Sequence, residues 1–205
     1  MTEEEKILER GKKTILQETE NIRALADSLG DEFVKAVKLI LDCEGKVVLT
    51  GMGKSGLVAK KISATLASTG TPSFYLHPAD GIHGDMGMVS ENDIVIALSN
   101  SGESSEIVNI LPTIKLIGCT LIGMVGREKS TLGSYSDLIL LTKITEEACP
   151  LGLAPTTSTS CQLVMGDALS LAIMEQRKFT ANQYAVFHPG GALGRKLLMR
   201  VRDVM

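Results

Sequence analysis

Short apolar runs rich in β-branched residues alternate with longer amphipathic stretches through the middle of the chain. Five such runs, at residues 46–50, 73–77, 93–98, 120–125 and 137–142, predict β-strands. Near-continuous apolar strands separated by helices are typical of a parallel sheet that is covered on both faces. We therefore predict an α/β fold: a three-layer, doubly wound, five-stranded parallel sheet with the flavodoxin-like strand order 2-1-3-4-5.

Helical patterns fill connections between these strands, at about residues 55–69, 104–118 and 129–134. Pro112 is expected to kink or shorten the second of these helices, because proline lacks a backbone donor. A long helix is predicted over residues 157–176, where a start rich in Thr and Ser suits the N-cap. The glycine-rich stretch at residues 183–195 predicts a loop.

The first 43 residues show the pattern of two amphipathic helices. The first helix is indicated by apolar residues on one helical face: Ile7, Leu8, Ile15, Ile22, Leu25 and Leu29. Gly30 separates the two helices, and Asp31 is expected to cap the second. We expect residues 1–43 to pack on the same domain as residues 44–205.

The composition is that of a globular domain and argues against several classes of protein. Of the 205 residues, 44% are hydrophobic and 22% are charged, which excludes disorder as the main state. The apolar runs are far shorter than the roughly 18 residues of a membrane span, and the charged N-terminus does not resemble a signal peptide. A net charge of −3 and an aromatic content of 3% argue against a nucleic-acid partner. The 4 cysteines form no CxxC pair, as in a reduced, cytoplasmic protein.

Two polar loops are expected to lie side by side at the carboxyl ends of the first and third strands, where this fold binds ligands. The first loop, at residues 51–56, fits the G-x-G-x-x-G pattern of dinucleotide sites. However, the second strand ends in His77 rather than an acidic residue, and Val48 stands where a nucleoside triphosphate loop needs glycine. Two further interpretations remain: a glycine turn that packs the strand on a helix, and an anion site to which Lys54 adds charge.

The second loop, at residues 99–106, carries serines around a glycine where a strand passes into a helix. Hydroxyl groups and free helix N–H groups meet at such a junction, which suits a phosphate monoester. Glu103 and Glu106 do not fit a bare phosphate cradle, because carboxylates repel phosphate. Either of them acts on another part of the ligand or lies in the first helical turn.

Histidines and glutamates complete the set of candidate groups. His77, His83 and His188 each lie next to glycine or proline in a predicted loop. Zinc ligation by His77 and His83 is conceivable, but no tight spacing of ligands supports a structural zinc site. Glu146 and Glu147 follow the fifth strand, so one of them could face the same loops. A phosphate cradle with a lysine, carboxylates and histidines suits proton transfer on a sugar phosphate, as in aldose–ketose isomerases.

These motifs closely resemble arabinose-5-phosphate isomerases of the sugar isomerase (SIS) domain superfamily. The resemblance runs from about Lys46 onward and rests on GMGKSG, STGTPSFYLHPAD, GIHGDMGM, ALSNSGESSEI, EEACPLGLAPTTSTS, LVMGDAL and HPGGALGRKLL. It implies the SIS fold and the interconversion of D-arabinose 5-phosphate and D-ribulose 5-phosphate, the first step towards Kdo in lipopolysaccharide and some capsules. Typical members continue through a segment like VRDVM into paired CBS domains, so we expect the CBS pair to be absent from this chain.

The resemblance also implies site residues. Functional importance falls on five side chains: Lys54, Glu106, Glu147, His83 and His188. With the two polar loops, the expected substrate-binding residues are Gly53, Ser55, Gly70, Thr71, His77, His83, Ser99, Ser101, Ser104, Lys143, Ile144 and Thr145. The resemblance assigns substrate contact to residues 109–118 as well.

We expect isomerisation to proceed through a cis-enediol intermediate. Glu147 is expected to be the base at C1 and C2, with Glu106 as the alternative. His83 or His188 would assist ring opening and protonation of oxygen, and Lys54 would stabilise negative charge. A carboxylate pKa raised by desolvation is expected to help the base work near neutral pH.

No cofactor is expected to be required, and zinc captured by His77 is expected to inhibit. The helix at 157–176 and the N-terminal helices carry more apolar surface than one sheet covers, so we expect a homo-oligomer, specifically a homotetramer. The resemblance adds a histidine supplied by a neighbouring subunit, for which His188 is the candidate. A sugar-phosphate sensor without catalysis is the alternative function.

Overall fold

Five parallel strands form one sheet in the computed structural model, which describes residues 1–189. The strands are β1 (Val47–Gly51), β2 (Ser73–Leu76), β3 (Ile94–Ser99), β4 (Thr120–Val125) and β5 (Leu138–Leu141). Their order is β2-β1-β3-β4-β5, and every neighbouring pair is parallel. The predicted fold class and strand order are therefore confirmed.

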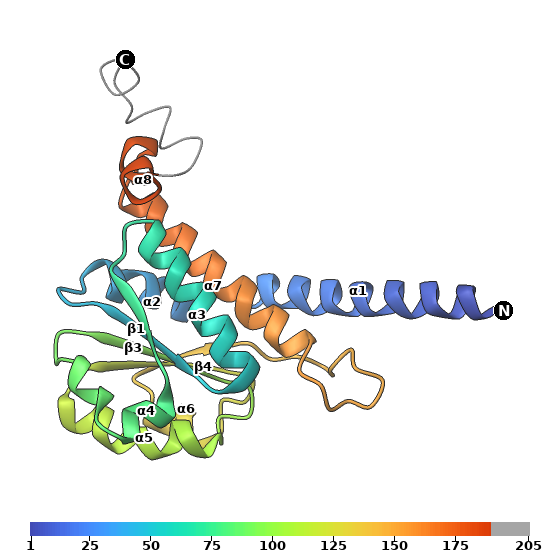
Figure 1. Cartoon of the computed structure of the whole chain (residues 1–205), viewed down its shortest axis with the longest axis horizontal. Helices are drawn as coiled ribbons and strands as arrows, with labels where there is room; N and C mark the ends of the chain where they lie inside the picture. The colour runs from blue at the N-terminus through green and yellow to red at the C-terminus, as the bar shows by residue number, and fades with distance from the viewer. Residues whose placement is uncertain (190–205) are drawn as a thin grey trace.

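Helices cover both faces of the sheet, as Figure 1 shows. They are α1 (Glu3–Asp27), α2 (Asp31–Leu41), α3 (Gly53–Ser68), α4 (Pro78–Ile82), α5 (Ser105–Ile117), α6 (Thr131–Tyr135), α7 (Thr157–Gln176) and α8 (Ala181–Phe187), with a 3₁₀ turn at Asp85–Met88. Alternate residues of a strand face opposite ways, so Leu49 lies in the core under α2, α3 and α7, while Val48 lies in the core over α5 and α6. The sheet is thus the middle of three layers.

Three local expectations are wrong, each for a physical reason. α5 runs through Pro112 to Ile117, so the proline does not shorten the helix. Gly30 is the N-cap of α2 and Asp31 is its first residue, so Asp31 caps nothing. The loop expected from residue 183 onward contains α8, which is started by a capping box between Thr180 and Gln183.

The N-terminal helix α1 packs on the domain only in its C-terminal part. Its buried residues are Asn21 and Leu25, and its N-terminal half projects from the body, as Figure 1 shows. Apolar side chains remain exposed along this half, with Ile7 at 66% and Ile15 at 67% exposure. The predicted packing of residues 1–43 is therefore observed only from the middle of α1 onward. Within residues 1–189, none of the helices has the length and apolar character that crossing a bilayer demands.

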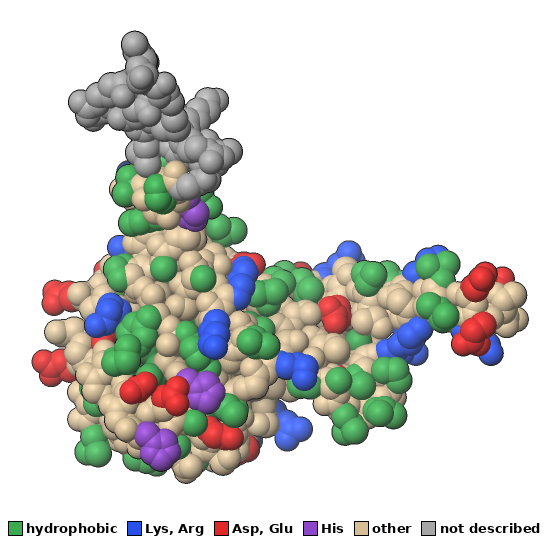
Figure 2. Space-filling model, in the orientation of Figure 1, with side chains coloured by type: hydrophobic (Ala, Val, Ile, Leu, Met, Phe, Trp, Pro, Cys, Tyr) green, Lys and Arg blue, Asp and Glu red, His purple; other side chains and the backbone are tan. Residues whose placement is uncertain are grey.

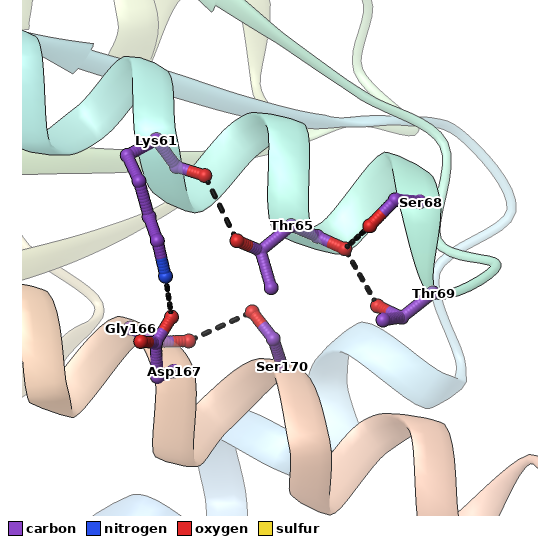
Figure 3. Close-up of polar contacts among 7 residues, drawn as sticks. All are labelled: Lys61, Thr65, Ser68, Thr69, Gly166, Asp167 and Ser170. Carbon is purple, nitrogen blue, oxygen red and sulfur yellow. Dashed lines mark hydrogen bonds and ion pairs between the residues drawn. The ribbon is translucent and has the colours of Figure 1, made fainter. Parts of the chain in front are cut away.

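Helices α3 and α7 pack in parallel, and this contact positions the candidate site. Lys61 of α3 pairs with Asp167 of α7, as Figure 3 shows. Beside this pair, Gly166 packs so closely on Ile62 that a Cβ atom at this glycine would overlap the isoleucine side chain. Both helices run the same way from this contact, so both begin at the carboxyl edge of the sheet.

Gln162 is a polar side chain in the apolar interior, one turn before Gly166. It has no exposed surface, and neither of its amide atoms has a hydrogen-bond partner among the described residues. Replacing it with methionine, which has a similar length, is expected to raise the free energy of unfolding by about 1–3 kcal/mol, because an unpaired buried polar group is removed. Urea unfolding measures this change.

The matched control for that substitution is Gln176→Met, which changes an exposed glutamine on the same helix. It should alter the free energy of unfolding by less than about 0.5 kcal/mol. A lower stability of Gln162→Met than of the unaltered protein would show that the buried amide contributes to folding.

Candidate active site at the carboxyl edge of the sheet

Strands β1 and β3 are neighbours whose following helices leave towards opposite faces of the sheet. After β1 the chain enters α3 on the face of α7, and after β3 it enters α5 on the other face. This is the switch point of a doubly wound sheet, where ligands bind at the carboxyl ends of the strands. The two polar loops therefore lie where the sequence predicts them.

The loop after β1 presents backbone donors and one lysine. Gly53 has a φ of 58°, which favours glycine, and a Cβ atom at Gly56 would lie 2.6 Å from the carbonyl oxygen of Gly51. The glycines thus pack the strand closely on α3, as one of the two interpretations holds. The N-cap residue Met52 provides no side-chain cap, so the first N–H groups of α3 stay available beside the exposed Lys54. The same turn therefore also suits an anion.

The loop after β3 is shaped by its own serines. The Ser99 and Ser104 hydroxyl groups lie 2.9 Å apart, and Ser99 Oγ accepts a hydrogen bond of 3.1 Å from the Gly102 N–H. Ser101 Oγ accepts from the Glu103 N–H at 3.2 Å. Ser104 is the N-cap of α5 but makes no side-chain cap. A second helix thus begins at this edge without a cap, and its N–H groups and nearby hydroxyls suit a phosphate.

The two glutamates of this loop have different surroundings. Glu103 accepts two hydrogen bonds of 2.7 Å from the hydroxyl and the N–H of Thr131, and these lower its pKa below the ordinary value. It joins the loop to α6 and is not directed to a ligand. Glu106 lies half-buried in the first turn of α5, where its carboxylate accepts a bond of 3.0 Å from Ser105. Only Glu106 of this pair remains a candidate for chemistry.

Two histidines flank α4, directly after β2. His77 is the N-cap of α4, and its Nδ1 lies 3.9 Å from the Asp80 carboxylate. His83 is the C-cap of α4 and is exposed. In the described part of the chain, no three side chains of His, Cys, Asp or Glu are grouped so that they could hold a metal ion. Zinc capture by His77 stays a prediction.

Glu147 is bound at the start of α7. Its carboxylate accepts hydrogen bonds from the Thr156 N–H at 2.8 Å, the Ser158 N–H at 3.2 Å, and both hydroxyl groups of these residues. The Thr and Ser residues expected to cap α7 thus surround a glutamate from an earlier segment, and the N-cap Thr156 makes no side-chain cap of its own. Because α7 and α3 begin at the same edge, Glu147 lies on the same side of the molecule as Lys54.

The protonation of Glu147 differs from expectation. Burial raises its pKa, but the hydrogen bonds from Ser158 and Thr156 lower it by more, so its pKa lies below the ordinary value of 4.5. The expectation of a carboxylate pKa raised by desolvation is therefore wrong for this residue. Glu147 is ionised at neutral pH, the form that accepts a proton.

The segment that precedes Glu147 uses its residues mainly for structure. Lys143 is exposed, and Ile144 packs against the core under α2, α3 and α7. Thr145 donates its backbone N–H to Asn21 of α1 at 2.9 Å. Of the three expected substrate contacts here, Lys143 alone has its side chain open to solvent.

The structure does not bring every expected residue to this edge. Gly70 and Thr71 lie between α3 and β2, at the amino edge of the sheet, where Gly70 packs against the ring of Phe179. The range 109–118 extends along α5 away from its start. Sequence likeness assigns all of these to substrate contact, but helix α3 carries the chain away from the candidate site before it reaches Gly70.

His188 also lies at the far edge of its own chain. It follows α8, which comes after the 20 residues of α7, a helix of about 30 Å at 1.5 Å per residue. Its ring stacks on Tyr184 at 3.8 Å, and its Nδ1 lies 2.9 Å from the Tyr184 carbonyl oxygen. Figure 2 shows histidine side chains both on the sheet domain and beside this C-terminal helix. The motif that continues after Pro189 lies outside the described residues.

Sequence reasoning missed the partners that hold the candidate glutamates. Thr131 binds Glu103, and Thr156 and Ser158 bind Glu147. The Thr/Ser-rich start of α7 was a usable signal, because free hydroxyl and N–H groups at a helix start favour a carboxylate. Contacts from α1 to the segment around Glu147 had no such signal.

Comparison with known proteins decides the family. The model of the SIS domain matches residues 40–172. The chain belongs to the SIS domain family. The match covers β1 to β5, both polar loops and most of α7 of this SIS domain.

Named relatives extend the comparison. This SIS domain protein is 55% identical over 193 residues to arabinose 5-phosphate isomerase KdsD of Pseudomonas aeruginosa, covering 94% of this chain. It is 51% identical over 195 residues to KdsD of Escherichia coli strain K12, covering 95% of this chain. The chain spans about 60% of the length of these curated relatives.

A solved structure is similar over its whole length. The protein c3406 of E. coli CFT073, in complex with arabinose 5-phosphate, superposes with a TM-score of 0.89 at 41% identity. The alignment covers 92% of this chain and 100% of that one. The observed SIS fold therefore also occurs in a protein of similar extent.

Proposed function

We propose that this SIS domain protein is an aldose–ketose isomerase that interconverts D-arabinose 5-phosphate and D-ribulose 5-phosphate. The observation that carries the proposal is the 55% identity, over 94% of this chain, to a relative named arabinose 5-phosphate isomerase. The site is chemically suited to this reaction, because it offers an anion anchor, a lysine and ionised carboxylates at one edge of the sheet. The product would supply the route to Kdo in lipopolysaccharide or capsule.

The proposed mechanism begins with the phosphate. The uncapped starts of α3 and α5 would hold it through N–H groups, with Ser55 and the serines of the second loop as further donors. Lys54 would add charge at the same edge. The phosphate anchor would then fix the sugar carbons relative to the carboxylates.

The proton transfer is assigned to Glu147. Its carboxylate would take the proton from C2 of the aldose, which leaves a cis-enediol stabilised by Lys54, and would return a proton to C1 to give the ketose. A histidine would move the accompanying proton between O1 and O2 and assist ring opening. Glu106 is the alternative base, and it lies on the start of α5.

An assay of purified protein tests this function directly. We expect turnover in both directions when D-arabinose 5-phosphate and D-ribulose 5-phosphate are supplied in turn, with heptulose phosphates assayed in parallel as controls. Turnover of a heptulose phosphate alone would assign a different substrate. Binding of all these sugar phosphates without turnover would favour a sensor.

We propose that the reaction requires no metal, because carboxylates and histidines suffice to move the protons. Turnover is expected to be unchanged in the presence of a chelator. Added zinc is expected to inhibit, and His77→Ala is expected to weaken this inhibition. Turnover that is abolished by the chelator and restored by zinc would contradict the proposal.

We propose, further, that the protein is a homotetramer whose sites combine residues of two chains. Two observations support it: the exposed apolar side chains of α1, which Figure 2 shows along the projecting helix, and the position of His188 at the opposite edge from Glu147. A neighbouring copy would cover the first and would bring the second to the site. A cytoplasmic location stays a prediction.

A further inference from the structure

The polar face of α1 contacts the segment on either side of Glu147. Arg10 donates from its guanidinium group to the carbonyl oxygen of Ala148, directly after the glutamate. Gln17 donates to the Glu146 carboxylate at 3.2 Å, directly before it. Asn21 accepts from the Thr145 N–H at 2.9 Å and from its hydroxyl at 3.3 Å. These three α1 residues recur at intervals of seven and four, so they lie on one face of the helix.

The innermost of these contacts is built into the fold. Asn21 is only 6% exposed, and its amide group donates to the carbonyl oxygen of Gln17 at 2.9 Å. That bond directs the remaining oxygen of Asn21 at Thr145. A buried side chain with both ends bonded has one orientation, so it defines where the segment starts.

The segment between β5 and α7 has no regular structure of its own. Its backbone therefore takes its position from neighbours, and α1 supplies contacts at Thr145, at Glu146 and at Ala148. The carboxylate of Glu147 is bound separately, by Thr156 and Ser158. Removing the contacts to α1 would free the backbone of Glu147 while leaving the partners of its carboxylate in place.

We propose that Arg10, Gln17 and Asn21 are positioning residues, through which α1 fixes Glu147 for proton transfer. The proposal rests on the proposed isomerase function, because it gives Glu147 a reaction to perform. A small misplacement of a reacting group costs up to about 100-fold in rate. The effect should fall on kcat and not on KM, because the phosphate anchor lies on α3 and α5.

The first test changes Arg10, whose contact lies outside the apolar core. Arg10→Met should lower kcat by about 10- to 100-fold with KM changed by less than about twofold. Arg10→Lys retains a donor and should recover part of the loss. Arg23→Met is the matched control: it changes an exposed arginine of the same helix and should leave kcat unchanged.

The second test changes Asn21 and separates acceptor from packing. Asn21→Asp keeps an oxygen for Thr145 and should retain more activity than Asn21→Leu, which offers none. Freedom of the segment would also loosen the bonds that lower the pKa of Glu147. The acid limb of the pH–rate profile should therefore move to higher pH in Arg10→Met and in Asn21→Leu.

Hydrogen exchange separates this proposal from the proposed function. Amides 145–148 should exchange faster in Arg10→Met than in Arg23→Met, whether or not the protein turns over the sugar phosphate. Equal exchange and equal kcat in these two variants would overturn the proposal. An inactive unaltered protein with the expected exchange pattern would instead contradict the isomerase function alone.

Discussion

Glu147→Gln is expected to lower kcat for D-arabinose 5-phosphate by about 100- to 10,000-fold, the usual contribution of a general base. Glutamine has the shape of glutamate but cannot accept the proton from C2. KM should change little, because the groups proposed to anchor the phosphate lie on α3 and α5. Steady-state kinetics of the variant and the unaltered protein measure both parameters.

Stability must be followed in the same variant, because Glu147 also binds the start of α7. The amide of glutamine cannot replace all of these bonds, so a loss of about 1 kcal/mol in unfolding free energy is expected, as for a lost helix cap. Glu175→Gln is the matched control, since it changes an exposed glutamate of α7. Near-normal turnover of Glu147→Gln together with an inactive Glu106→Gln would move the role of base to Glu106.

The lowered pKa of Glu147 gives this prediction a pH dependence with a definite sign. The carboxylate is stabilised in the folded state, so its contribution to stability is present above the unfolded pKa, near 4.5, and is lost as the pH falls through the lower folded pKa. The acid limb of the rate due to Glu147 should therefore lie below pH 4.5. Ser158→Ala removes one lowering hydrogen bond and should shift this limb to higher pH.

The sheet could be predicted from the sequence because its signals are local. Each strand is a buried apolar run, and the helices between them force parallel neighbours, so the order 2-1-3-4-5 followed. The bounds of α7, Thr157–Gln176, agree with the predicted range. α8 was missed although the local pattern of Thr180 and Gln183 marks a capping box.

The candidate site could be predicted only in part, because its decisive contacts are not local. Lys54 and the serines lie on loops that directly follow strands, so their edge follows from the topology. The pKa of Glu147 depends on Thr156 and Ser158 folding back on an earlier segment, which no periodicity reports. The far position of Gly70 was within reach, since a helix that follows a parallel strand must return the chain to the amino edge.

Mixing two inactive variants is expected to restore activity if His188 acts in a neighbouring subunit. His188→Ala and Glu147→Gln should each be inactive, because each lacks one of the groups proposed for the reaction. In a hybrid, the intact His188 of one chain can serve the intact Glu147 of another. With random pairing after co-refolding, about a quarter of the sites receive both residues, so about a quarter of the normal activity should return.

Lys54→Met provides the matched control for this mixing, because Lys54 and Glu147 lie at the same edge of one chain. Hybrids of Lys54→Met with Glu147→Gln should stay inactive, since no site receives both residues from a single chain. Recovery in this control as well would mean that the two residues also meet across chains.

The result with His188 then depends on geometry alone. Within one chain, α7 separates the end that carries Glu147 from the end that leads to His188 by about 30 Å. No bend of the α8 segment spans that distance, so a shared reaction requires two copies. Proven hybrids without any recovery would exclude His188 of a neighbouring subunit from the site. A monomer by light scattering would contradict the assembly itself, and the exposed apolar face of α1 would then need another partner.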